Sequence, residues 1–242
     1  MVNYDDISKV YDRVRQADAD LIRRLLQEID AHPSAHMLDI GCGTGNYADA
    51  LLRLSHAHIV GVDRSDEMLG HARQKNAQVS FRQGDAEHLP LDDALFDLVY
   101  MTDVIHHVPH IDRMFGEIRR VLKPGGKTCI VTQSHAQIAA RPIARFFPAT
   151  VTVDQARYPD IPAIIIAATG QELTFLDEEI NGDDEAVLDH SFLELVRAKG
   201  YSMLHLIADA EYRRGLARLE AALRQGDLTI RQAGRTLVWF RR

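Results

Sequence analysis

Met37-Leu-Asp-Ile-Gly-Cys-Gly-Thr-Gly-Asn46 is the most informative stretch of the chain, because a strand-like apolar run ends there in an acid and three closely spaced glycines. Glycine lacks a Cβ, so Gly41, Gly43 and Gly45 can take backbone angles that other residues avoid, and a ligand can lie against the main chain. Residues 47–54 continue with the spacing of an amphipathic helix. The pattern predicts a strand, a tight turn and a helix start, which form the first unit of a doubly wound α/β sheet.

Acidic residues recur at or just after the ends of four successive predicted strands. They are Asp39, Asp63 after residues 58–62, Asp85 after residues 79–81, and Asp103 after residues 96–101. In such sheets ligands bind outside the carboxyl ends of the strands, so the four acids are expected at one ligand-binding edge. Each acid taken singly also fits a solvated loop or a helix cap. Their recurrence favours a binding edge.

The spacing of the glycines separates two kinds of nucleotide site. A dinucleotide fingerprint places its third small residue one position later, where this chain has Asn46. A pyrophosphate would favour a helix N-terminus, whereas acid-rich strand ends suit a ligand that carries positive charge. The third glycine is Gly45, so a nicotinamide-dinucleotide site is disfavoured.

The chain resembles the class I S-adenosylmethionine-dependent methyltransferases, of the small-molecule type that includes the ubiquinone-biosynthesis enzymes. The resemblance runs from about Asp39 to Gln133. The segments that carry it are Leu38–Gly45, Gly61–Asp63 with Ser65 and Met68, Gly84–Glu87 with Leu89-Pro90, Phe96–Val99, His106–Val108 and Arg120–Val131. The order of these segments, rather than any one of them, makes the resemblance specific. It implies a Rossmann-like, doubly wound seven-stranded sheet, mostly parallel with an antiparallel last strand, and helical cap insertions.

The resemblance also assigns cofactor-binding residues for S-adenosylmethionine. Asp39 and the backbone of residues 41–45 would face the methionine portion, Asp63 the ribose, Met68 the adenine face, and Asp85 with Ala86 the adenine edge. The full expected set is Tyr11, Asp39, Gly41, Cys42, Gly43, Gly45, Asp63, Arg64, Met68, Asp85, Ala86, Glu87 and Thr102. Tyr11 belongs to a segment, residues 4–13, that resembles the family's lid; the alternative is a helix docked on the core.

Methyl transfer requires little from the protein beyond holding the nucleophile, methyl group and sulfur in line and excluding water. A base is needed only where the nucleophile must lose a proton. His107 and His106 are the candidates, because they follow the fourth strand and imidazole titrates near neutrality. Asp103 is a third candidate as proton acceptor or substrate ligand, and a structural role remains open for all three. No metal site is expected, since Pro109 interrupts the helix that His106 and His110 would need.

One methyltransferase domain is expected over residues 1–242, with lid helices at 1–30 and cap insertions at 134–170 and 181–226. Helices are predicted near residues 21–29, 111–122, 160–169, 192–196 and 212–223, and strands near 127–132, 172–177 and 235–240. In the first insertion Arg141, Arg145 and Arg157 fit an acidic acceptor, and Phe146, Phe147 and Tyr158 a flat or apolar one. Solvated charges and packing aromatics are the alternative.

Composition narrows the classes of binding partner expected for the chain. A net charge of −7 without blocks of like charge provides no basic face for non-specific nucleic-acid binding. The longest apolar run is too short for a bilayer span, so a soluble, unprocessed cytoplasmic protein is expected. The two cysteines, Cys42 and Cys129, have no partners at metal-binding spacing and are expected to be plain thiols.

The expected activity is methyl transfer to a small organic acceptor, with the acceptor atom and the oligomeric state open. Two alternatives remain. The chain could use another group of S-adenosylmethionine, such as the aminopropyl group, or a carboxylated derivative of the cofactor. It could also be a non-catalytic cofactor-binding subunit that regulates another methyltransferase.

Overall fold

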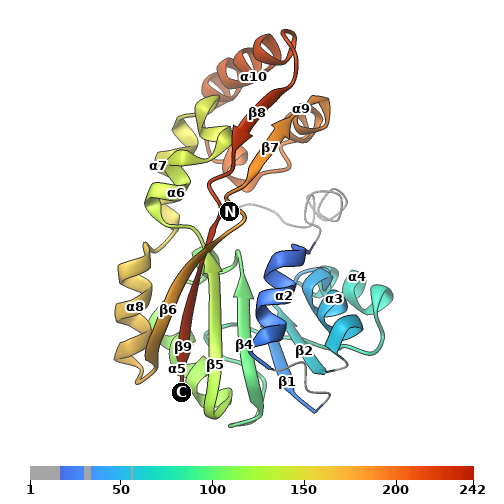
Figure 1. Cartoon of the computed structure of the whole chain (residues 1–242), viewed down its shortest axis with the longest axis vertical. Coiled ribbons are helices and arrows are strands. Elements are labelled where there is room, and N and C mark those ends of the chain that lie inside the picture. The colour runs from blue at the N-terminus through green and yellow to red at the C-terminus, as the bar shows by residue number, and fades with distance from the viewer. Residues whose placement is uncertain (1–16, 30–33, 56) are drawn as a thin grey trace. The chain divides into compact units, whose positions relative to one another are not determined.

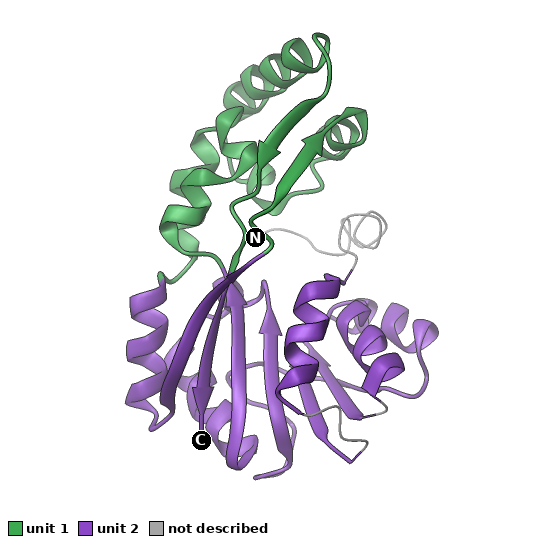
Figure 2. Ribbon diagram, in the orientation of Figure 1, with its two compact units in different colours: residues 1–14, 133–160, 182–235 green, residues 15–132, 161–181, 236–242 purple. Residues whose placement is uncertain are grey.

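The computed structural model describes residues 17–29, 34–55 and 57–242 (Figure 1). These residues form two compact units (Figure 2). The sheet unit comprises the described residues of 15–132 together with 161–181 and 236–242. The insertion unit contains residues 133–160 and 182–235. The expected lid segment, with Tyr11, lies outside the described residues.

The sheet unit is built on a seven-stranded sheet with the strand order β3-β2-β1-β4-β5-β9-β6. The strands are β1 (His36–Ile40), β2 (His58–Asp63), β3 (Ser80–Gln83), β4 (Phe96–Thr102), β5 (Leu122–Thr132), β6 (Thr174–Asn181) and β9 (Arg235–Arg241). The pairs β1-β2, β2-β3, β1-β4 and β4-β5 are parallel, whereas β9 runs antiparallel to β5. The predicted mostly parallel, doubly wound sheet with an antiparallel last strand is confirmed.

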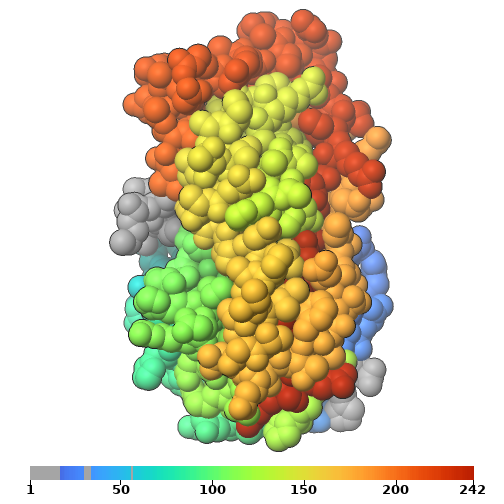
Figure 3. Space-filling view, turned by 90° about the vertical axis from the view of Figure 1, so that its left-hand side faces the viewer, coloured from blue at the N-terminus to red at the C-terminus, as the bar shows by residue number. Residues whose placement is uncertain are grey.

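Successive residues of a strand point to opposite sides of the sheet, so both faces carry apolar side chains. Helices cover both faces. They are α2 (Ala19–Gln27), α3 (Asn46–Ser55), α4 (Asp66–Lys75), α5 (Ile111–Val121) and α8 (Ile161–Gly170), with a 3₁₀ turn η1 (Ile105–His107). Met37 belongs to the core that contains the apolar residues of α2 and α3. Its neighbour Leu38 belongs to the core of α5 and α8. In Figure 3 the surface of α8 lies beside that of α5.

The insertion unit has a core of its own, formed by residues such as Phe147, Val196 and Leu219. Its elements are α6 (His135–Ala140), η2 (Pro142–Arg145), α7 (Ala149–Arg157), β7 (Glu185–Leu188), α9 (His190–Arg197), η3 (Ser202–His205), α10 (Asp209–Leu223) and β8 (Leu228–Arg231). Strands β7 and β8 pair antiparallel in a two-stranded sheet.

The compact units differ in their boundaries from the predicted insertions. The first predicted insertion, 134–170, includes α8, yet α8 lies in the sheet unit because Ile161, Ile164 and Ala168 are buried in the core of α5. The second, 181–226, stops before β8, whose pairing with β7 extends the insertion unit to residue 235. Apolar periodicity predicts that a helix is buried, but not which core receives it.

Candidate functional site

The glycine turn connects β1 to α3 in a left-handed backbone path. Gly41, Gly43 and Gly45 have φ angles of 73°, 52° and 75°, a region that residues with a Cβ rarely adopt. The N–H groups of Gly41 and Cys42 donate to the Val62 carbonyl, at 2.7 and 3.1 Å. The turn is thereby attached to the end of β2, next to the predicted ribose ligand.

Asp63 connects the turn with the start of α4. Its Oδ2 accepts from the Gly43 N–H at 2.8 Å and its Oδ1 from the Ser65 N–H at 2.9 Å. A carboxylate oxygen has further acceptor capacity beyond one such bond, so Asp63 can still receive ribose hydroxyls. The first two predicted parts of the site, the glycine turn and Asp63, are in direct contact.

Asp39 is the buried acid of the site. It lies in β1 beside Gly61 of β2 and Tyr100 of β4, and only 3% of it is exposed. Burial, together with the nearby Asp63 carboxylate, raises the pKa of Asp39 to about 7, although the Tyr100 hydroxyl opposes this shift. Such a carboxyl is poised to ionise when a cation approaches it.

The predicted adenine-binding residues gather after β2 and β3. The N–H of Gly84 donates to the Asp63 carbonyl at 3.0 Å. Arg64 Nε lies 3.5 Å from Asp85 Oδ2, and Asp85 Oδ1 accepts from the Glu87 N–H at 2.9 Å.

Three more members of the predicted set have visible structural contacts. Met68 and Ala86 are buried, at 4% and 8% exposure, and Ala86 is part of the core shared with α5. Glu87 accepts from the His110 N–H at 3.0 Å, so it holds the start of α5. For Glu87 this contact provides a structural role in addition to the predicted one.

The predicted methyl-transfer residues follow β4. Thr102 ends that strand, and Asp103 has a left-handed φ of 55° while its N–H donates to the Val131 carbonyl at 3.0 Å. His106 and His107 lie on η1 with their ring centroids 3.9 Å apart. His107 is exposed and His106 partly buried, so the structure brings both imidazoles to one short turn.

Val104 and Phe81, to which the sequence pattern assigned no role in the site, pack against glycines in and beside the turn. A Cβ on Gly41 would lie 2.4 Å from the side chain of Val104, and a Cβ on Gly61 would lie 2.7 Å from Phe81 and 2.8 Å from the Cys42 sulfur. The turn is therefore packed against β2, β3 and the loop after β4. Gly61 was part of the matched sequence pattern, but nothing in the sequence indicated that Val104 closes on the turn.

Cys42 and Cys129 are both free and buried. Burial raises the pKa of each thiol well above its usual range.

The aromatic residues of the first insertion divide by burial. Phe146 and Phe147 are buried in the core of the insertion unit, so they pack rather than face a ligand. Arg145 is exposed, and its guanidinium carbon lies 5.9 Å from the Phe146 ring centroid. Arg141 and Arg157 differ from it, because both are partly buried.

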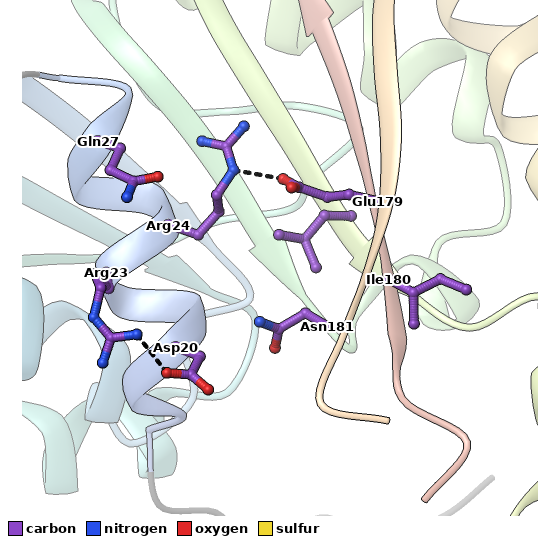
Figure 4. A pocket seen from close by; sticks show the side chains of 8 residues that line it. Asp20, Arg23, Arg24, Gln27, Glu179, Ile180 and Asn181 are labelled. Atoms are coloured by element: carbon purple, nitrogen blue, oxygen red, sulfur yellow. Dashed lines mark hydrogen bonds and ion pairs between the residues drawn. The ribbon is translucent and has the colours of Figure 1, made fainter. Parts of the chain in front are cut away.

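A hollow of about 290 Å³ lies elsewhere in the sheet unit, between α2 and β6 (Figure 4). Arg24 Nε pairs with Glu179 at 2.6 Å and Arg23 with Asp20 at 2.6 Å, while Leu237 contributes to the lining. None of the predicted cofactor residues lines it, and its charges are paired with one another. We assign it no ligand.

Across the described residues, no helix is both long and apolar enough to cross a bilayer.

Comparison with known proteins identifies the family. Residues 38–130 match the family model described as "Methyltransferase domain". A demethylmenaquinone methyltransferase of Lactiplantibacillus plantarum is 32% identical over 158 residues, which cover 60% of this chain and 67% of that protein. The chain belongs to the class I S-adenosylmethionine-dependent methyltransferases.

Other relatives match the chain over different lengths. A malonyl-[acyl-carrier protein] O-methyltransferase of Pectobacterium atrosepticum is 32% identical over 129 residues, 53% of this chain and 51% of that protein. The chain thus spans about half of that relative. A protein from an antibiotic biosynthesis pathway of Anabaena variabilis has a similar structure, with a TM-score of 0.76 at 21% identity over 93% of this chain and 98% of that one. At this identity the likeness establishes the fold alone.

Proposed function

We propose that the chain transfers a methyl group from S-adenosylmethionine to a small organic acceptor. The observation that carries the proposal is the contact of the glycine turn with Asp63, 2.8 Å from the Gly43 nitrogen, next to the buried Asp39. An adenosyl sulfonium with an amino acid end requires three features of its site. They are glycine backbone that the ligand can approach closely, a hydrogen-bond acceptor for the ribose hydroxyls, and a buried acid for the positive charge. The small acceptor is supported by relatives named for demethylmenaquinone and malonyl-[acyl-carrier protein].

Each residue has a defined task in this proposal. Asp39, once ionised, offsets the positive charge of the cosubstrate, and the turn of residues 41–45 admits its methionine portion against the backbone. Asp63 accepts the ribose hydroxyls, while Asp85 and Ala86 bound the adenine edge, with Met68 at its face. When bound, S-adenosylmethionine supplies a methyl group already activated on sulfur. The protein then contributes mainly alignment of the acceptor and exclusion of water.

Changing Asp63 to alanine is expected to weaken S-adenosylmethionine binding by about tenfold to hundredfold, because hydrogen bonds to a charged acceptor are lost. Calorimetric titration with S-adenosylmethionine, S-adenosylhomocysteine and NAD measures this. Asp92→Ala serves as the matched control, since Asp92 is exposed and outside the site. Thermal unfolding of each variant separates lost contacts from lost folding. Binding of NAD alone would contradict the proposal.

We propose His107, and secondarily His106 or Asp103, as the group that accepts a proton from the acceptor. For an acceptor whose nucleophile carries a proton, His107→Gln is expected to lower kcat about 100-fold, within the range for general-base catalysis. Cosubstrate affinity should stay unchanged. His110→Gln is the control, because His110 is exposed and its side chain makes no cap bond to α5. Equal small losses in both variants would argue for alignment alone.

Two alternatives are tested by the product. Mass analysis of the product distinguishes an added methyl group from an aminopropyl or carboxylated group. Turnover by the isolated chain would exclude a purely regulatory cofactor-binding subunit. The cytoplasmic location remains a prediction from the sequence.

A further inference from the structure

Two arginines of the insertion unit flank one buried carboxylate. Asp154 in α7 is completely buried. Arg141 Nη1 pairs with its Oδ2, and Arg157 Nη2 pairs with its Oδ1, which Arg157 Nε also approaches at 3.1 Å. The arginine side chains are only 11% and 20% exposed. The three groups form one cluster, called here the Arg141-Asp154-Arg157 cluster.

Neighbouring side chains hold both guanidinium groups in place. Arg141 Nε donates to Gln133 Oε1 at 2.7 Å, and Arg157 Nη2 donates to Ser202 Oγ at 3.3 Å. The guanidinium carbons of the two arginines lie 5.2 and 5.9 Å from the ring centroid of Tyr158. Stacking and hydrogen bonds of this kind already restrict the arginine side chains, so ligand binding costs less side-chain conformational entropy.

The charges of the cluster do not balance. Asp154 carries one negative charge, and one arginine would neutralise it, yet two arginines contact it. Among the described residues no other carboxylate pairs with either arginine. Mostly buried charge is costly unless it is paired. Arg141 Nη2 and Arg157 Nη1 also make no hydrogen bond to the described residues, so donors remain available on both forks.

We propose that the Arg141-Asp154-Arg157 cluster binds an oxyanion, the carboxylate or phosphate group of a small acidic molecule. Guanidinium groups present paired N–H donors whose geometry matches such anions, and the extra positive charge supplies the attraction. The anion site goes beyond the proposed methyltransferase function and does not rest on it.

Inorganic phosphate and acetate serve as probes. Each is titrated calorimetrically into the full chain at constant ionic strength set with chloride. Saturable binding of one probe, at one site per chain, is expected, and the preferred probe distinguishes a phosphate ligand from a carboxylate ligand. Arg157→Gln should weaken that binding at least about tenfold, since a charge-assisted bond is lost. Arg145→Gln, an exposed arginine of the same insertion, should change it less than twofold.

Asp154→Asn separates an anion site from a purely structural ion cluster. Removing the carboxylate leaves two unbalanced cations, so anion affinity should rise and added anion should restore a lowered Tm. A structural cluster would instead lose stability in Asp154→Asn and Arg157→Gln without any anion dependence. That result, or equal anion binding by wild type, Arg157→Gln and Arg145→Gln, would overturn the proposal.

S-adenosylmethionine titration of the same variants keeps the two proposals separate. Arg157→Gln should retain wild-type cosubstrate affinity. Anion binding without any cosubstrate binding would remove the proposed function and leave the anion site. Cosubstrate binding without anion binding would remove only the anion site.

Discussion

Changing Asp39 to asparagine is expected to weaken S-adenosylmethionine binding about tenfold to hundredfold while stabilising the ligand-free protein at pH 8. The first effect follows from the loss of a buried carboxylate that would face the cationic end of the cosubstrate. The second follows because burial, with a smaller contribution from Asp63, raises the pKa of Asp39 to about 7 from the ordinary aspartate value of 3.8. Keeping that carboxyl ionised at pH 8 costs about 4 kcal/mol of folding stability, an upper figure.

The pH dependence has a defined direction. Because the folded pKa is raised, the contribution of Asp39 to stability is fully present below about pH 4 and is lost as pH rises to about 7. Cosubstrate binding favours the ionised form, so its affinity should fall up to about tenfold per pH unit below 7 and level off above 7.

Calorimetric titration and denaturant unfolding between pH 5 and 9, a range of about two units on each side of 7, measure both effects. Asp92→Asn is the control, because it removes the same charge from an exposed position. The difference between wild type and Asp39→Asn isolates this carboxyl, since the ionisations of the cosubstrate are common to both proteins. An unchanged pH profile in Asp39→Asn would contradict the assignment.

Changing Gly41 to alanine is expected to destabilise the protein by about 2–6 kcal/mol and to weaken cosubstrate binding. The new Cβ would lie 2.4 Å from Val104, at a φ of 73° that alanine rarely adopts. Backbone strain and overpacking each cost about 1–3 kcal/mol. Denaturant unfolding gives the stability change, and titration with S-adenosylmethionine gives the affinity.

Gly70→Ala is the matched control. Gly70 lies inside α4, and a Cβ added there would have no atom within 4 Å, so alanine should raise stability by about 0.5–1 kcal/mol. Adding Val104→Ala to Gly41→Ala separates the two costs. The double variant should regain the stability lost to the steric clash and keep the loss caused by the unfavourable φ angle. Equal stability changes in Gly41→Ala and Gly70→Ala would refute the packing of the turn.

Most of the sheet could be predicted because its signals are local. Apolar runs such as Met37–Ile40, followed by glycine and an acid, indicate a buried parallel strand and its ligand-binding end. The predicted strand boundaries were less accurate than the predicted strand directions. β3 begins at Ser80 rather than 79, and β6 covers Thr174–Asn181 rather than 172–177. The strand ends are set by pairing with neighbours, which local composition does not contain.

The pair of strands in the insertion unit was missed for a similar reason. β7 and β8 are separated by residues 189–227, and each has only four residues. Strands that short become stable through a partner and an adjacent core rather than through their own propensity. For this region the sequence pattern predicted only helices, near residues 192–196 and 212–223.

The sequence alone determined the backbone chemistry of the site: glycines where the chain turns left-handed, and acids at the ends of successive parallel strands. These properties depend on residue type and spacing, so they can be read along the chain. The tertiary structure decided which charges are buried and what faces them. Only folding places Asp39 away from water, closes Val104 over Gly41 and brings Arg141 and Arg157 onto one carboxylate. Desolvation and packing depend on atoms far apart in the chain, so no local pattern encodes them.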